Sequence, residues 1–117
     1  MRAIIEGVEG GSLDIFKGSN VVLDAVLLSD DGTQIDITGG TLQLLAYDTE
    51  DRRNAAIDDH AGAIATATAG YATFTYVPAD LNWGPGTNGA PYWGYVKFTT
   101  SGGVESVANV PVKINIK

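Results

Sequence analysis

The chain has 117 residues, a net charge of −7, no cysteine and one histidine. This length allows one domain with one core, and the lack of cysteine excludes disulfides, thiolate zinc sites and thiol catalysis. Nucleic-acid binding depends on Lys and Arg and is therefore disfavoured, and no apolar run approaches the roughly 20 residues that cross a bilayer.

Residues 1–11 are acidic and end in Gly10-Gly11, which indicates an N-terminal arm or a first edge strand ahead of a single domain over 12–117. Glu6 and Glu9 occupy the place where a signal peptide needs apolar residues. We therefore expect a protein made and used, or assembled, inside a cell. Short alternating segments then predict strands over 13–17, 21–28, 34–37 and 41–47, separated by turns at 18–20, 29–32 and 38–40.

The second half begins with residues 48–60, whose five acids and two arginines show no two-residue period and indicate a surface loop with one helical turn. A hairpin is predicted over 61–68 and 71–77, followed by a Gly- and Pro-rich segment over 82–91. Strands are predicted over 92–100 and 104–117. Pro111 cannot donate a backbone hydrogen bond, so the last strand lies at a sheet edge or is bulged there.

Seven to nine short antiparallel strands in a chain of this length are typical of an immunoglobulin-like β-sandwich. The predicted fold class is therefore all-β. A small closed barrel is the alternative arrangement.

Several turn segments carry a resemblance to a known family. They read FKGSNV over 16–21, DDG over 30–32 and IDITGG over 35–40, and the strands GYATFTY over 70–76 and 92–98 extend the likeness. The set resembles the N-terminal Ig-like domain of phage upper baseplate proteins and related small virion domains. Those domains share an aromatic-x-Gly-Asp/Asn opening, an Asp-Gly hairpin and an Asp-Leu-Thr-Gly turn, and Ile37 stands here where Leu is usual. The resemblance covers about residues 13–117 and specifies a fold better than a function.

The resemblance implies a virion protein, assembled in the host cytoplasm, that is structural and not an enzyme. A capsid decoration protein docking on the repeating particle surface fits a stand-alone domain, and a baseplate or tail adaptor is the alternative. The implied partners are the major capsid protein or tail and baseplate proteins, and self-association stays open. Nucleic acid, membrane and cofactor are not expected.

Candidate partner-binding residues are apolar side chains on segments that cannot be regular core strand. They are Ile4, Ile5 and Val8 in residues 1–11, and Trp83 in the Gly- and Pro-rich segment. Trp93 and Tyr95 join them, because strand parity places both on the face opposite Tyr92. Such aromatics fit a core, a protein interface or a glycan-binding platform.

The acidic clusters are expected to have structural roles in turns and in a surface loop. Asp30, Asp31 and Asp36 lie at predicted turns, and residues 48–59 form a solvated loop, so a bound cation is not expected. His60 is expected at the surface. The sequence contains no Gly-x-Ser-x-Gly, His-Glu-x-x-His or Walker motif, so we expect no catalytic residue and no enzyme activity.

Overall fold

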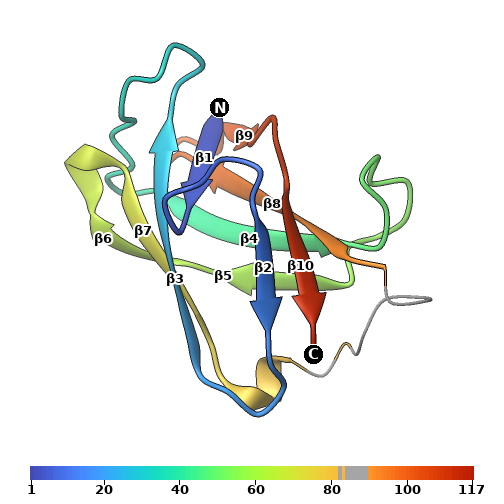
Figure 1. Ribbon diagram of the computed structural model, residues 1–117. Coiled ribbons are helices and arrows are strands. Elements are labelled where there is room, and N and C mark those ends of the chain that lie inside the picture. The colour runs from blue at the N-terminus through green and yellow to red at the C-terminus, as the bar shows by residue number, and fades with distance from the viewer. Residues whose placement is uncertain (82, 84–89) are drawn as a thin grey trace.

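The computed structural model describes residues 1–81, 83 and 90–117. Within these residues the chain forms ten strands in two facing sheets (Figure 1). The strands are β1 (Arg2–Ile5), β2 (Ser12–Ile15), β3 (Val21–Leu28), β4 (Thr41–Tyr47), β5 (Asp58–Ala61), β6 (Ala63–Thr66), β7 (Tyr71–Tyr76), β8 (Tyr92–Thr99), β9 (Glu105–Val107) and β10 (Val112–Ile116). Two short 3₁₀ turns, η1 (Ala67–Ala69) and η2 (Pro78–Asp80), flank β7. No helix in the described part of the chain is long and apolar enough to span a membrane.

The strand order is that of an immunoglobulin-like sandwich. Sheet A has the order β1-β3-β7-β6 and sheet B has the order β2-β10-β8-β4-β5, with β9 also pairing with β8. These orders correspond to strands A-B-E-D and G-F-C-C′ of the immunoglobulin fold. β2 takes the place of a short A′ strand parallel to the last strand. The prediction of an Ig-like sandwich is confirmed, and the closed barrel is excluded because the two sheets remain separate.

The core lies between the sheets and follows the period-two alternation of the strands. β3 points Leu23, Ala25 and Leu27 inward, while Val22 and Asp24 face outward. The remaining core residues from the strands are Ala3, Ile5, Ala72, Phe74 and Tyr76 of sheet A and Ile15, Leu42, Leu44, Tyr92, Val96, Phe98, Val112, Ile114 and Ile116 of sheet B. Ile37 and Leu81, both outside the strands, close the core.

Residues 1–11 are not an arm. β1 pairs antiparallel with β3, and Ala3 and Ile5 are buried in the core. The chain then crosses from sheet A to sheet B at Gly10-Gly11, since β2 belongs to sheet B. Of the two alternatives for this segment, the structure therefore has the edge strand.

The predicted long strand over 104–117 is broken into β9 and β10. Residues 108–111 belong to neither strand, although the Ala108 N–H still donates to the Val96 carbonyl oxygen of β8 over 2.9 Å. Pro111, which has no N–H to donate, ends the break. Val110 lies in this break and is exposed, and Val104, in the turn before β9, is exposed as well. Unbroken alternation through 104–117 would have placed both with the core residues Val112, Ile114 and Ile116. The segment 48–60 also differs from expectation, since it contains no helical turn and its last residues enter β5.

Candidate interaction surfaces

The three candidate residues near the N-terminus do not form one surface. Ile5 points into the core and is only 4% exposed, so its assignment as a docking residue is wrong. Ile4, the next residue along the strand, points to the opposite face of sheet A. Val8 lies in the turn after β1, where its backbone exchanges two 3.1 Å hydrogen bonds with Ile5, and its side chain is exposed.

Trp83 closes one end of the core. Its indole Nε1–H donates to the Asp80 carbonyl oxygen over 2.9 Å, and its ring meets Tyr92 edge to face at 4.7 Å. The Tyr92 hydroxyl donates in turn to the Trp83 carbonyl oxygen over 2.9 Å. The side chain is half-buried against the core cluster. Residues 82 and 84–89 of the predicted Gly- and Pro-rich docking segment lie outside the described residues.

Tyr95 lies on the outer face of sheet B but is covered. Its hydroxyl donates to the Glu50 carbonyl oxygen over 2.6 Å, the Arg52 guanidinium lies 4.5 Å above its ring, and Tyr47 meets it edge to face. Only 6% of the residue is exposed. Tyr95 therefore anchors the β4–β5 loop, and its assignment as an exposed docking residue is wrong.

Trp93 shares that outer face, as strand parity predicts, and it is half-buried. The Lys113 ammonium lies 5.4 Å above its ring, and the two residues are cross-strand partners. With Tyr95 covered and Trp93 capped by a cation, the two side chains do not present the pair of open rings that a glycan platform needs. The glycan alternative has no geometric support on this face.

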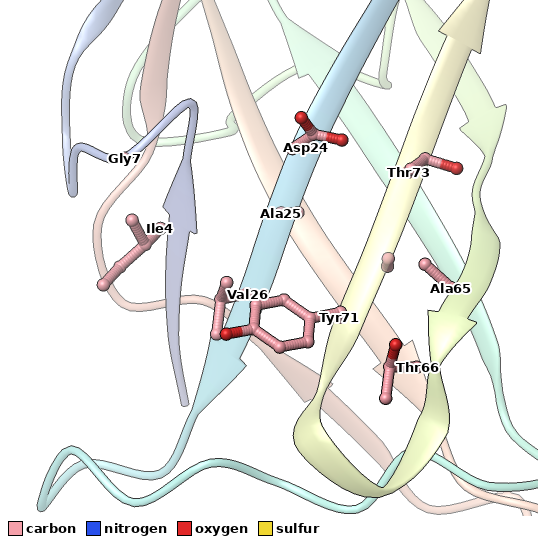
Figure 2. A pocket seen from close by; sticks show the side chains of 10 residues that line it. Ile4, Gly7, Asp24, Ala25, Val26, Ala65, Thr66, Tyr71 and Thr73 are labelled. Carbon is pink, nitrogen blue, oxygen red and sulfur yellow. The ribbon is translucent and has the colours of Figure 1, made fainter.

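The outer face of sheet A carries a hollow that the sequence did not predict. It has a volume of about 380 Å³ and lies over β1, β3, β7 and β6 (Figure 2). The strand register places Ile4 beside Val26 and Val26 beside Tyr71, which makes one apolar row across three strands. Figure 2 shows the Tyr71 ring reaching from β7 toward Val26. Val22, farther along β3, is 57% exposed on the same face.

A second row, two residues along β3, is acidic. Asp24 pairs with Thr73 across the ladder and points into the hollow (Figure 2). The Asp24 backbone N–H donates to a carboxylate oxygen of Glu6 over 2.7 Å, while the Glu6 N–H donates to the Asp24 carbonyl oxygen. The Asp24 side chain thus lines the hollow beside the apolar row, and the Glu6 carboxylate lies next to it, at the Asp24 backbone. We call the apolar row and this acidic row together the sheet A groove.

Basic residues lie away from the sheet A groove. Arg2 is on β1, but its Nε is held 3.0 Å from a Glu9 carboxylate oxygen. The other basic residues all belong to or adjoin strands of sheet B: they are Lys17, Arg52, Arg53, Lys97, Lys113 and Lys117. Arg2 shares the outer face of sheet A with Ile4 but is paired with Glu9. Among the described residues, the acidic side chains of the groove therefore have no cation paired with them.

His60 is not a free surface side chain. It extends from β5 of sheet B and stacks on Tyr76 of sheet A, and its ring nitrogen Nε2 contacts the Thr75 carbonyl oxygen. Burial raises the pKa of the neighbouring Asp58, whose Oδ2 atom has no hydrogen-bond partner among the described residues. The described residues contain no group of three His, Asp or Glu side chains that could hold a metal ion. This cluster joins the two sheets and offers no catalytic set.

Asp31 and Asp36 serve turns, as predicted, whereas the Asp30 carboxylate accepts from the N-terminal ammonium group over 3.0 Å and from the Asn109 side-chain amide over 2.8 Å. Asp31 accepts hydrogen bonds from the Ser29 hydroxyl and, over 3.0 Å, from the Thr33 N–H. These donors lower the pKa of Asp31 to about 2. Asp36 accepts from the Thr38 N–H over 3.0 Å in the next turn.

Comparisons with known proteins do not assign the chain to a family. No family model matches the sequence, and no curated protein matches it. Among solved structures, the filamin domain of Lin-41 is similar at 10% identity with a TM-score of 0.45, covering 98% of this chain and 91% of that one. Murine CRIg is similar at 10% identity with a TM-score of 0.41, covering 91% and 92%. The fold assignment rests on the strand order described above.

Proposed function

We propose that this chain is a non-enzymatic structural protein of a phage particle, a capsid decoration protein that docks through the sheet A groove. Two independent features support the proposal. One is the resemblance of its turn segments to small virion domains. The other is the apolar row of Ile4, Val26 and Tyr71 on an outer sheet face.

The apolar row is the observation that carries the docking role. In a sandwich with one core, the outer faces are expected to be polar. Tyr71 and Val22 are nevertheless 42% and 57% exposed beside a hollow. An apolar patch of this kind, rimmed by polar residues, is explained most simply by a partner that covers it.

The mechanism of such a protein is passive. A protein that binds only the assembled particle stabilises the assembled state by mass action. The ten-strand scaffold supplies a rigid face for this contact. No covalent bond is made or broken, so the function requires only a folded scaffold that holds the contact residues in place.

The test is to locate the chain in purified particles made by the host that carries its gene. We expect many copies on the capsid lattice by mass spectrometry and by density in the intact particle. The double variant Val26→Ser/Tyr71→Ser is expected to fold, by circular dichroism and melting, but to be lost from the particles. The matched control Val104→Ser, at a position 65% exposed in the β8–β9 turn, should be incorporated fully.

Other outcomes separate the alternatives. Density confined to the tail tip would replace the decoration role by that of a tail adaptor. A chain that is absent from particles, or a folded double variant that is incorporated fully, would contradict the proposal.

A further inference from the structure

We propose that the sheet A groove binds an extended segment of a partner protein in which an apolar residue and a Lys or Arg stand two positions apart. The apolar side chain occupies the row of Ile4, Val26 and Tyr71, and the cation lies beside Asp24 and Glu6. The inference names the partner's chemistry, and it rests on the proposed function only for the role of this face as a docking surface.

The size of the hollow fits a side-chain anchor. Its 380 Å³ lies at the lower end of the volumes that hold small ligands, so it accommodates one or two large side chains. Its β6 side is lined by the small residues Ala65 and Thr66 (Figure 2). A neighbouring backbone can therefore come close to the sheet there, and the Tyr71 ring supplies a rigid apolar contact of the kind found at interface hot spots.

The charge of the groove selects the second residue. The carboxylate of Asp24 has no cationic partner within ion-pair distance among the described residues, and the Glu6 carboxylate beside it accepts only the Asp24 N–H there. Two neighbouring anions on a chain of net charge −7 disfavour an acidic partner. A Lys or Arg from the partner would reduce their repulsion and would set specificity more than affinity, because the site is exposed.

The spacing of the two rows indicates that the bound partner segment is extended. Val26 and Asp24 are two residues apart on one strand, which separates the rows by about 7 Å. Residues i and i+2 of an extended segment have the same separation and point to the same side. A segment laid along β3 therefore presents one side chain to each row.

A second copy of this chain is disfavoured as the occupant. Two cations on the outer face of sheet B are already engaged, since Lys113 lies over the Trp93 ring and the Lys97 ammonium is 3.3 Å from a Glu105 carboxylate oxygen. Two copies also repel each other through their net charge. The occupant we infer is a different protein.

The experiment uses the full chain as the target for selection from a random peptide library displayed on a carrier. We expect the enriched peptides to share an apolar residue and a Lys or Arg two positions apart. A synthetic peptide of the enriched sequence should shift the backbone amide resonances of Asp24, Val26 and Tyr71, and its affinity should fall as salt is raised.

Variants locate the site. Tyr71→Ser and Asp24→Lys, each shown to be folded by its melting curve, should weaken the peptide about tenfold or more. The matched controls Val104→Ser and Glu50→Lys make the same kinds of change at exposed positions outside the groove, and they should leave the affinity within about twofold.

Several results would overturn the inference. They are the enrichment of no peptide, a motif without a basic residue, binding that survives both groove variants, and concentration-dependent dimerisation that Asp24→Lys abolishes. If the peptide binds as described but the chain is absent from particles, the proposed function fails and the groove assignment stands. If the chain is on the capsid but the groove variants bind the peptide normally, the groove assignment fails alone.

Discussion

The His60 ring stacks on the Tyr76 ring with centroids 3.8 Å apart and an angle of 15° between the planes. His60 comes from the edge strand of sheet B and Tyr76 from the centre of sheet A, so the pair joins the two sheets. Tyr76 is 1% exposed, and its hydroxyl has no hydrogen-bond partner among the described residues. Burial raises the pKa of this hydroxyl, which therefore stays protonated.

The first prediction follows from this unpartnered hydroxyl. Tyr76→Phe keeps the stacked ring and removes a buried polar group whose desolvation costs about 1–3 kcal/mol when it has no partner. We expect the free energy of unfolding in urea to be unchanged or to rise by about 1 kcal/mol. Tyr92→Phe is the matched control and should lose about 1 kcal/mol, because the Tyr92 hydroxyl donates to the Trp83 carbonyl. A larger loss at Tyr76 than at Tyr92 would contradict the prediction.

The second prediction concerns Asp58, whose pKa is raised because burial disfavours its charged form. A group that holds its proton more tightly in the folded state adds stability at low pH, and this is lost as pH rises from about 4 through the raised folded pKa. Asp58→Asn cannot ionise. We expect the variant to melt higher than the wild type at pH 7, with the gain shrinking toward pH 3.5. A gain of equal size at both pH values would show that ionisation of Asp58 is not the cause.

The third prediction concerns Asp31, whose contribution to stability changes with pH in the opposite direction. The Ser29 hydroxyl and the Thr33 N–H lower its pKa to about 2, so its ionised form is favoured by folding. This contribution is present above the unfolded pKa of about 4 and disappears as pH falls to about 2. Asp31→Asn should lower the melting temperature at pH 6 and match the wild type near pH 2. Val104→Ser, which changes no titratable group, is the control at an exposed position and should show no such convergence.

The fourth prediction compares two glycines with positive φ. Gly70 has φ 72°, and a Cβ there would lie 2.7 Å from the Leu27 carbonyl oxygen, while Gly103 has φ 87° and open space around it. Ala at either position takes on the left-handed strain of roughly 1–2 kcal/mol. Gly70→Ala adds a backbone clash and should cost at least about 2 kcal/mol more than Gly103→Ala in urea denaturation. Equal costs would mean that the backbone around Gly70 shifts enough to relieve the clash with the Leu27 carbonyl oxygen.

The fifth prediction separates the two neighbouring isoleucines of β1. Ile5→Ala removes a buried core side chain and should cost about 2–5 kcal/mol of unfolding free energy. Ile4→Ala, on the outer face, should cost less than about 1 kcal/mol. If both substitutions were neutral, β1 would not contribute to the stability of the sandwich.

Local signals in the sequence predicted most of the strands, but the strand predicted over 34–37 is wrong, since only Gln34 forms an isolated bridge, with Leu28. The alternation of residues 21–28, 41–47, 71–77 and 92–100 predicted β3, β4, β7 and β8, because a half-buried strand needs an apolar residue at every second position. The Asp-Gly and Gly-Gly turns bounded them for the equally local reason of turn geometry. Alternation failed over 104–117, where the break between β9 and β10 is set by long-range pairing with β8.

The candidate residues likewise divide into features that local sequence predicted and features that only the fold decided. Parity placed Trp93 and Tyr95 together on one outer face, but only the folded β4–β5 loop decided that Tyr95 is covered. Apolar residues on both faces of 21–28 were the one local sign of the sheet A groove. The sequence cannot bring Ile4, Val26 and Tyr71 side by side, because that row depends on the pairing of three strands far apart in the chain.

By itself, then, the sequence determined an all-β chain, its turns and its acidic charge, since these depend on residue type and on neighbours a few positions away. The tertiary structure alone decided that residues 2–5 form an edge strand, that His60 joins two sheets, and that one outer face combines an apolar row with two carboxylates. The physical reason is that side chains meet across a sheet through the register of backbone hydrogen bonds. A shift of one residue in that register would turn each of these side chains to the opposite face.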